Sequence, residues 1–170
     1  MMRILFFRHI NFEIQSTFVT VREVFVGKSF ALFSKLYVHF KKNKPWGITI
    51  QELLDHKIGS LGHHLGCFLL QHKFNPQPKC EDHDVFHVLT TYSTDTADEI
   101  AMQFYLHGNG KRSPFLNLAL ACGLLFYMDK YSLFFTAHHK GSQALPIYLV
   151  DYSKILDMPL QEFREKFKLT

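Results

Sequence analysis

The sequence predicts an all-α protein whose 170 residues fold as a single-domain helical bundle. A hydrophobic content of 47% in a chain of this length is enough for one sizeable core. Apolar residues recur at helical spacing along most of the chain, and capping residues precede many of these segments. Only Leu145 to Val150 could form a short strand, and no partner strand is evident. An all-helical fold follows.

The chain divides into an N-terminal helical extension, residues 1–44, and a helical core, residues 45–170, which together form one compact domain in this interpretation. In the extension, phenylalanines and valines recur between charged residues, which fits one or two amphipathic helices broken near Gly27. The polar stretch from Lys41 to Gly47 is the expected boundary between extension and core.

Several helices of the core have a recognisable first residue. These start signals are the capping box of Thr49 with Glu52, the cap Ser60, the pair Ser113-Pro114, and Asp157-Met158-Pro159. The helix from Phe115 to Met128 is apolar almost all round but has only about fifteen residues, fewer than the roughly 20 that span a bilayer. We therefore expect it to be the buried central helix.

Four potential metal ligands follow one another at spacings that helices can use. His83 and His87 stand one turn apart on a helix, and Asp84 lies about 100° round from His83. The turn-forming residues 92–96 should reverse the chain, so that a second helix carries Glu99 back toward the first. Two imidazoles and two carboxylates then converge. This donor set suits zinc, iron or manganese better than calcium or magnesium.

Two of these residues have alternative interpretations. Thr96-Ala97-Asp98-Glu99 matches a capping box, in which the Glu99 side chain would bond to a backbone amide instead of a metal. Cys80, three residues before His83, could also be a ligand, although a buried free thiol is the simpler expectation.

The pattern His-Asp-x-x-His, then eleven residues and Glu, resembles the signature of the coenzyme Q (ubiquinone) biosynthesis protein 4 family. The matching residues are His83, Asp84, His87 and Glu99. Residues 59–62, Gly-Ser-Leu-Gly, are similar to the family's Ser-Leu-Gly stretch, so the likeness runs from about residue 45 to the C-terminus. Thr91 and Asp98 stand where the family commonly has glycine.

The resemblance implies a divalent metal, zinc first with iron or manganese as alternatives, held by His83, Asp84, His87 and Glu99. It also implies a metal-dependent lyase of quinone biosynthesis, in which His83 and Asp84 act in the oxidative decarboxylation of a prenylated aromatic ring. The expected partners are a prenylated lipid or quinone precursor, a membrane surface, other biosynthetic enzymes and a second copy of the chain. The alternative is a non-catalytic prenyl-lipid-binding or scaffold protein of a biosynthetic complex.

Two other enzyme classes share part of the pattern. The zincin helix has His-Glu-x-x-His, but the aspartate here is one methylene shorter than that glutamate. Histidine-aspartate phosphohydrolases combine an upstream histidine, a His-Asp doublet and a distant aspartate, which His63 or His64, His83-Asp84 and Asp129 could imitate. Neither class accounts for Glu99.

Charge and cysteine content limit the remaining functions. The net charge of +4, from 19 basic and 15 acidic residues, is too small and too scattered for nucleic-acid binding. The three cysteines form neither an even set nor a Cys-x-x-Cys motif, which is typical of a reducing compartment. We expect a cytoplasmic protein, with peripheral attachment to the inner face of the membrane as a further possibility.

Overall fold

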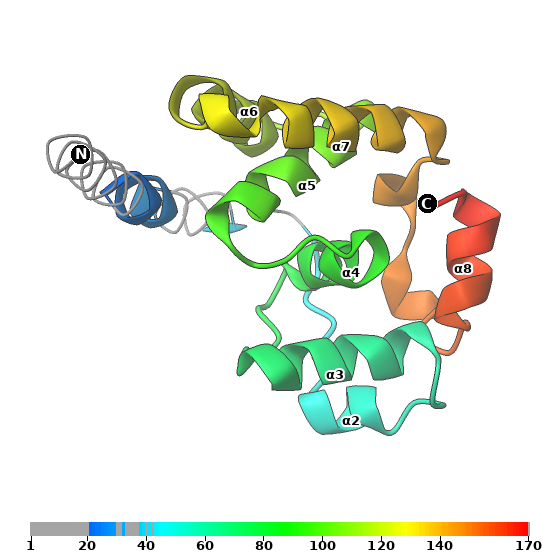
Figure 1. Cartoon of the computed structure of the whole chain (residues 1–170). Coiled ribbons are helices and arrows are strands. Elements are labelled where there is room, and N and C mark those ends of the chain that lie inside the picture. The colour runs from blue at the N-terminus through cyan, green and yellow to red at the C-terminus, as the bar shows by residue number, and fades with distance from the viewer. Residues whose placement is uncertain (1–20, 30–31, 33–37, 40, 42, 170) are drawn as a thin grey trace, which may run out of the picture.

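The computed structural model describes residues 21–29, 32, 38–39, 41 and 43–169 (Figure 1). The α-helices of the core are α2 (Ile50–Leu54), α3 (Leu61–His72), α4 (Glu81–Thr90), α5 (Thr96–Gly108), α6 (Pro114–Phe126), α7 (Tyr131–Gln143) and α8 (Leu160–Phe167). Short 3-10 turns link the later helices: η1 (Met128–Lys130), η2 (Ile147–Leu149) and η3 (Tyr152–Lys154). Among the described residues the only β pairing is an isolated bridge, so the all-α prediction is confirmed.

Residues 145–150, the one segment that could have formed a short strand, contain the 3-10 turn η2 instead. The buried side chain of Asn109 explains the difference. Its Oδ1 accepts a hydrogen bond of 2.8 Å from the backbone N–H of Ile147, and its Nδ2 donates to backbone carbonyls that include Leu145 O at 2.9 Å. These bonds satisfy backbone groups that a strand would have paired with a neighbouring strand.

In the extension, residues 21–29 form one helix that continues through Gly27, so the predicted break near this glycine is wrong within the described residues. Arg22 attaches this helix to the core, since its guanidinium lies 2.6 Å from Asp129 and 4.1 Å from the centre of the Tyr127 ring. The rest of the predicted helical extension lies largely outside the described residues.

The predicted caps at Thr49, Ser60 and Ser113 form as expected, whereas α8 begins after Pro159 without a side-chain cap from Asp157. The Thr49 side chain accepts from the backbone N–H of Glu52, whose carboxylate in turn accepts from the Thr49 N–H. The hydroxyl of Ser60 accepts from His63 N, and that of Ser113 accepts from Leu116 N. Each bond satisfies a backbone donor that the first turn of a helix leaves unpaired.

The central helix of the bundle is α5. The seven consecutive residues Ile100–Leu106 are all buried, which means that every side of this helix faces protein. Figure 1 shows α5 between α4 on one side and the pair α6 and α7 on the other, with α3 and α2 beyond α4 and α8 alongside. The core therefore forms around α5.

The prediction of a buried central helix from Phe115 to Met128 is wrong. In α6 only Leu116, Ala119 and Gly123 are buried, whereas Leu125 and Met128, at and just beyond the helix end, are 69% and 68% exposed. One face of α6 packs on the core and the other leaves apolar side chains at the surface. Within the described residues no single helix is long and apolar enough to cross a membrane, although α6 and the following η1–α7 segment pass such a test together as a pair bent by 102°.

The backbones of α5 and α7 touch through two glycines. A Cβ atom at Gly108 would overlap the backbone oxygen of His138, and one at Gly141 would overlap that of Tyr105. Because neither glycine carries a side chain, the two helices can approach more closely than larger residues would allow. This crossing is the most extensive helix–helix contact in the described structure.

The C-terminal segment returns to the start of α3. Backbone hydrogen bonds of 2.8 Å run from Leu61 N to Met158 O and from Gly62 N to Leu156 O. The terminal helix α8 buries Phe163, whose ring stacks on Phe167 with 4.2 Å between centroids, as their spacing of four residues predicts. The end of the chain is thus part of the core.

We predict that Gly141→Ala lowers the free energy of unfolding by about 2–3 kcal/mol, because the added methyl group forces α5 and α7 apart. Chemical denaturation monitored by circular dichroism measures the change. Lys140→Ala, at an exposed position of the same helix, serves as the control and should change stability by less than about 0.5 kcal/mol. Equal stability of Gly141→Ala and the wild type would contradict the close crossing.

Candidate metal centre

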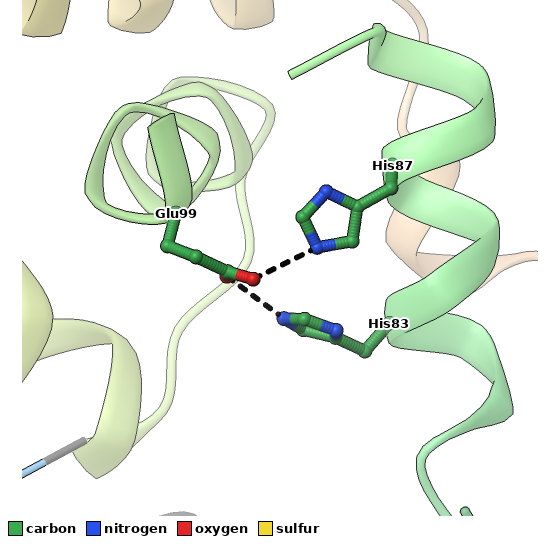
Figure 2. Close-up of side chains that lie close together, drawn as sticks. All are labelled: His83, His87 and Glu99. Atoms are coloured by element: carbon green, nitrogen blue, oxygen red, sulfur yellow. Dashed lines mark hydrogen bonds and ion pairs between the residues drawn. The ribbon is translucent and has the colours of Figure 1, made fainter. Parts of the chain in front are cut away.

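The helix α4 carries the two histidines of the predicted site. Its first turn contains Glu81, Asp82 and Asp84, whose negative charges interact favourably with the positive end of the helix dipole. His83 and His87 lie one turn apart and project from the same face, with their ring centroids 4.9 Å apart. The sequence spacing therefore places both imidazoles toward α5, as Figure 2 shows.

Glu99 comes from the first turn of α5. The N-cap of this helix is Asp95, not Thr96, because the Asp95 side chain accepts a 3.0 Å hydrogen bond from the Asp98 backbone N–H. The alternative interpretation of Glu99 as part of a capping box is therefore wrong. Its carboxylate is free to extend across the gap between the helices toward the two histidines of α4 (Figure 2).

The three side chains converge on a small volume. Nε2 of His83 lies 3.2 Å from Oε2 of Glu99, and Nε2 of His87 lies 3.0 Å from Oε1. Taking one ligand atom from each residue, all three atoms lie within 4.8 Å of one another, close enough to hold one metal ion. The His87 side chain is only 2% exposed, while that of His83 is 36% exposed, so one side of the group is open.

The backbone of Tyr92 determines which nitrogen of His87 faces Glu99 as an acceptor. Nδ1 of His87 lies 3.0 Å from the Tyr92 carbonyl oxygen, and because a carbonyl only accepts, we assign the hydrogen to Nδ1. In the neutral ring Nε2 then presents a lone pair to the Glu99 carboxylate. Two acceptors at 3.0 Å require a cation between them, either a proton or a metal ion.

The protonation states of His83 and Glu99 depend on each other. Burial disfavours the charged form of His83, but its interactions with Asp84 and Glu99 outweigh burial and raise its pKa to about 9. Burial also disfavours the ionised carboxyl of Glu99, but hydrogen bonds from His83 and His87 outweigh it and lower its pKa to about 2. At neutral pH the group therefore combines a carboxylate with a protonated histidine whenever no metal ion replaces that proton.

The donor set fits a divalent transition metal. Two histidines with one glutamate, and one coordination position left for water or substrate, form a set found in catalytic zinc sites. The hydrogen bond from His87 Nδ1 to a backbone carbonyl is the kind of outer contact that orients metal-ligating histidines. His83, His87 and Glu99 could thus hold a metal ion, and the same nitrogen and oxygen donors also suit iron or manganese.

Asp84, the fourth predicted ligand, lies beside His83 and is not one of the three converging residues. Its Oδ1 is 3.7 Å from Nδ1 of His83, whereas it is the other nitrogen, Nε2, that faces Glu99. In this arrangement Asp84 favours a charged or hydrogen-bonded His83. Its direct ligation of a metal stays a prediction, as does the catalytic role of His83 and Asp84.

A pocket of about 300 Å³ adjoins the open side of the group. Its wall includes His83 and Asp84 together with residues of the α5–α6 connection and of η2. Lys111, which no sequence motif marked, also lines this pocket. Burial, followed by repulsion from Lys41, lowers the pKa of Lys111 to about 8. The one feature of the sequence that could have drawn attention to Lys111 is its position directly after Gly108-Asn109-Gly110, which ends a helix.

Other candidate residues lie outside the group. His63 bonds to Leu54 O through Nδ1 at 3.0 Å, and His138 faces His107 at 3.2 Å, so the adjacent histidine pairs belong to the surface and core edge, as predicted. None of these pairs lines the pocket. Asp129 is bound to Arg22 and does not join the histidines, which removes the support for a phosphohydrolase arrangement. Cys80 is a free thiol that lines the pocket wall.

Comparison with known proteins finds a similarity at the level of the fold. No family model and no curated protein matches the sequence. Among solved structures, the fold is similar to the 2.85 Å crystal structure of a protein from Nostoc punctiforme PCC 73102 that is provisionally named a ubiquinone biosynthesis protein. The TM-score is 0.62 at 17% sequence identity, and the similarity covers 90% of this chain and 82% of the other. The comparison shows a common fold.

We predict that Thr91→Gly raises the free energy of unfolding by about 0.5–1 kcal/mol. Thr91 ends α4 with a φ of 62°, and a β-branched residue in this left-handed region is strained by roughly 1–2 kcal/mol, of which glycine's larger freedom in the unfolded chain offsets a part. Denaturant titration measures the change. Thr91→Ala, which keeps a Cβ atom, is the matched control and should gain less. A destabilised Thr91→Gly protein would contradict this account.

We also predict that metal affinity rises with pH. Because the pKa of His83 is raised to about 9, the imidazole is mainly protonated at lower pH, and a metal ion must displace that proton. Each pH unit below 9 should therefore change the apparent affinity about tenfold. Competition with a chromogenic chelator between about pH 6 and 8.5 measures this slope. Glu99→Gln removes one of the two carboxylates, after Asp84, that raise the pKa of His83, and should both weaken binding and flatten the slope. An affinity independent of pH would oppose the assignment.

Proposed function

We propose that this protein binds one divalent metal ion through His83, His87 and Glu99 and acts on a prenylated quinone or aromatic precursor. The observation that carries the proposal is the convergence of two imidazoles and a carboxylate beside an open pocket. The resemblance of the His-Asp-x-x-His and Glu pattern to ubiquinone biosynthesis proteins, together with the fold shared with a protein of that provisional name, supports this choice of substrate class.

The proposed reaction is oxidative decarboxylation of the ring: the bond between ring and carboxylate breaks with release of carbon dioxide, and a hydroxyl group is bonded to the same ring carbon. Dioxygen accepts the two electrons and, with one water consumed, leaves as hydrogen peroxide. A bound metal ion would supply Lewis acidity, which stabilises negative charge on the reacting ring. His87 and Glu99 have the holding role, since they are the less exposed members of the group. His83, which lines the pocket, faces the substrate, and Asp84 stabilises a proton on its Nδ1.

A non-catalytic role in binding a prenyl lipid or organising a biosynthetic complex is the second candidate. The exposed apolar side chains at the junction of α6 and α7 favour it, because Leu125, Met128 and Phe135 are each more than half exposed. Such a surface suits contact with a membrane, with other biosynthetic enzymes or with a second copy of the chain. In either role we propose a cytoplasmic protein attached peripherally to the membrane.

Elemental analysis of protein purified without added metal or chelator tests the proposal. We expect about one equivalent of metal in the wild type and less than about a tenth of that in His87→Ala and Glu99→Ala, because a site with two remaining ligands binds much more weakly. His64→Ala, at an exposed histidine outside the group, is the control. Metal content that is unchanged in Glu99→Ala would refute the site.

The identity of the metal and the extracted lipids separates the two candidate functions. Iron or manganese together with oxygen-dependent turnover of a prenylated aromatic acid would support the enzyme. Zinc with a co-purifying prenyl lipid and no turnover would support the binding protein.

A further inference from the structure

Lys111 lines the pocket as a cation that forms no direct ion pair with a described residue, although the carboxyl group of Asp82 attracts it at longer range. Its Nζ makes no hydrogen bond or ion pair with any described residue, and its closest described interaction is with the face of the Phe86 ring, 4.8 Å from the ring centre. Desolvation of an ammonium group is costly unless it is paired. The lowered pKa of Lys111 reflects the same burial.

The chain directs Lys111 into the pocket by a specific turn. The backbone N–H of Lys111 donates to Leu106 O at 2.9 Å, which closes the end of α5. The preceding Gly110 has a φ of 106°, and its missing side chain leaves room for the Tyr148 ring, which would lie 3.3 Å from a Cβ atom at this position. Asn109 holds the chain next to Tyr148 by accepting from the Ile147 N–H. Three consecutive residues therefore arrange one wall of the pocket.

The other charged groups that line the pocket define what it can accept. Lys41 also lies on the wall, where its Nζ donates to the Lys79 carbonyl at 2.6 Å and keeps its positive charge. Asp82 and Asp84 contribute carboxyl groups to the same wall. They oppose a ligand with several negative charges, because like charges repel at short range. Because two lysines and two carboxyl groups nearly balance on this wall, the pocket suits at most a single negative charge, next to Lys111.

We propose that Lys111 binds the carboxylate of an aromatic acid whose ring occupies the pocket and whose other end reaches His83 and Asp84. The volume of about 300 Å³ lies at the lower end of small-molecule sites, which fits one substituted ring. Phe86 and Tyr148 provide aromatic surface, and Gln103 and Asn43 provide polar groups for ring substituents. This assignment rests on the proposed function for the nature of the substrate, and it identifies the residue that selects for a carboxylate.

Calorimetric titration of the full-length protein with benzoate, benzamide and inorganic phosphate tests the assignment. We expect benzoate to bind about tenfold or more tightly than benzamide, since a hydrogen bond between two charged groups is lost in the amide. Lys111→Met should reduce benzoate affinity to the level of benzamide. Lys57→Met, at an exposed lysine outside the pocket, should leave the preference unchanged.

Stability measurements show that the variant is folded and add a second readout. Without ligand, Lys111→Met should unfold at the same temperature as the wild type or higher, because it removes a desolvated charge. Benzoate should raise the unfolding temperature of the wild type only. If Lys111→Met does not fold, Lys111→Gln replaces it in both experiments. Benzoate preference that persists in a folded variant, or phosphate binding as tight as benzoate binding, would overturn the assignment.

Metal content measured on the same samples keeps this inference separate from the proposed function. Lys111→Met should retain the metal content of the wild type, since Lys111 is not one of the converging ligands. Benzoate selectivity that depends on Lys111 in a protein without metal would support the carboxylate site and refute the metal-dependent function. Normal metal content with no benzoate selectivity would support the metal site of the proposed function and refute the carboxylate site at Lys111.

Discussion

The burial of the middle of α5, residues Ile100–Leu106, is the constraint on which the rest of the structure depends. Ile100–Leu106 are surrounded by protein on every side, and the glycine contacts with α7 fix the helix along its axis. Glu99 immediately precedes this buried run, and Lys111 follows the end of the same helix. Because this helix is rigid, the carboxylate of Glu99 at its start and the ammonium group of Lys111 beyond its end keep a constant separation.

The candidate centre uses this rigidity to hold groups that would separate in water. A carboxylate between two imidazoles is stable here because the helices enforce the distances and because His87 is almost fully screened from solvent. The low local dielectric strengthens the attraction between the carboxylate and each protonated imidazole. It also makes an unpaired charge in the group unfavourable. The group could hold a cation, and its more exposed member, His83, lines the pocket.

Features governed by local chemistry could be predicted from the sequence, whereas features governed by tertiary packing could not. Capping at Thr49, Ser60 and Ser113 depends on a few neighbouring residues, and the spacing of His83 and His87 follows from helix geometry alone. The predicted burial of α6 was wrong because apolar composition does not distinguish a core helix from a half-exposed one. Lys111 was missed because only the folded chain brings it beside α4.

The pairing of the C-terminal segment with the start of α3 has a kinetic consequence. The contact between Leu61 and Met158 closes a loop that contains most of the helical core, so its loop-closure entropy is larger than that of the contacts between α5 and α7, which are much closer in sequence. Release of the last helix would open this end of the molecule while leaving the crossing of α5 and α7 intact. Such an opening would also release the Val88 carbonyl, next to His87, which accepts a 2.9 Å hydrogen bond from Arg164 of α8.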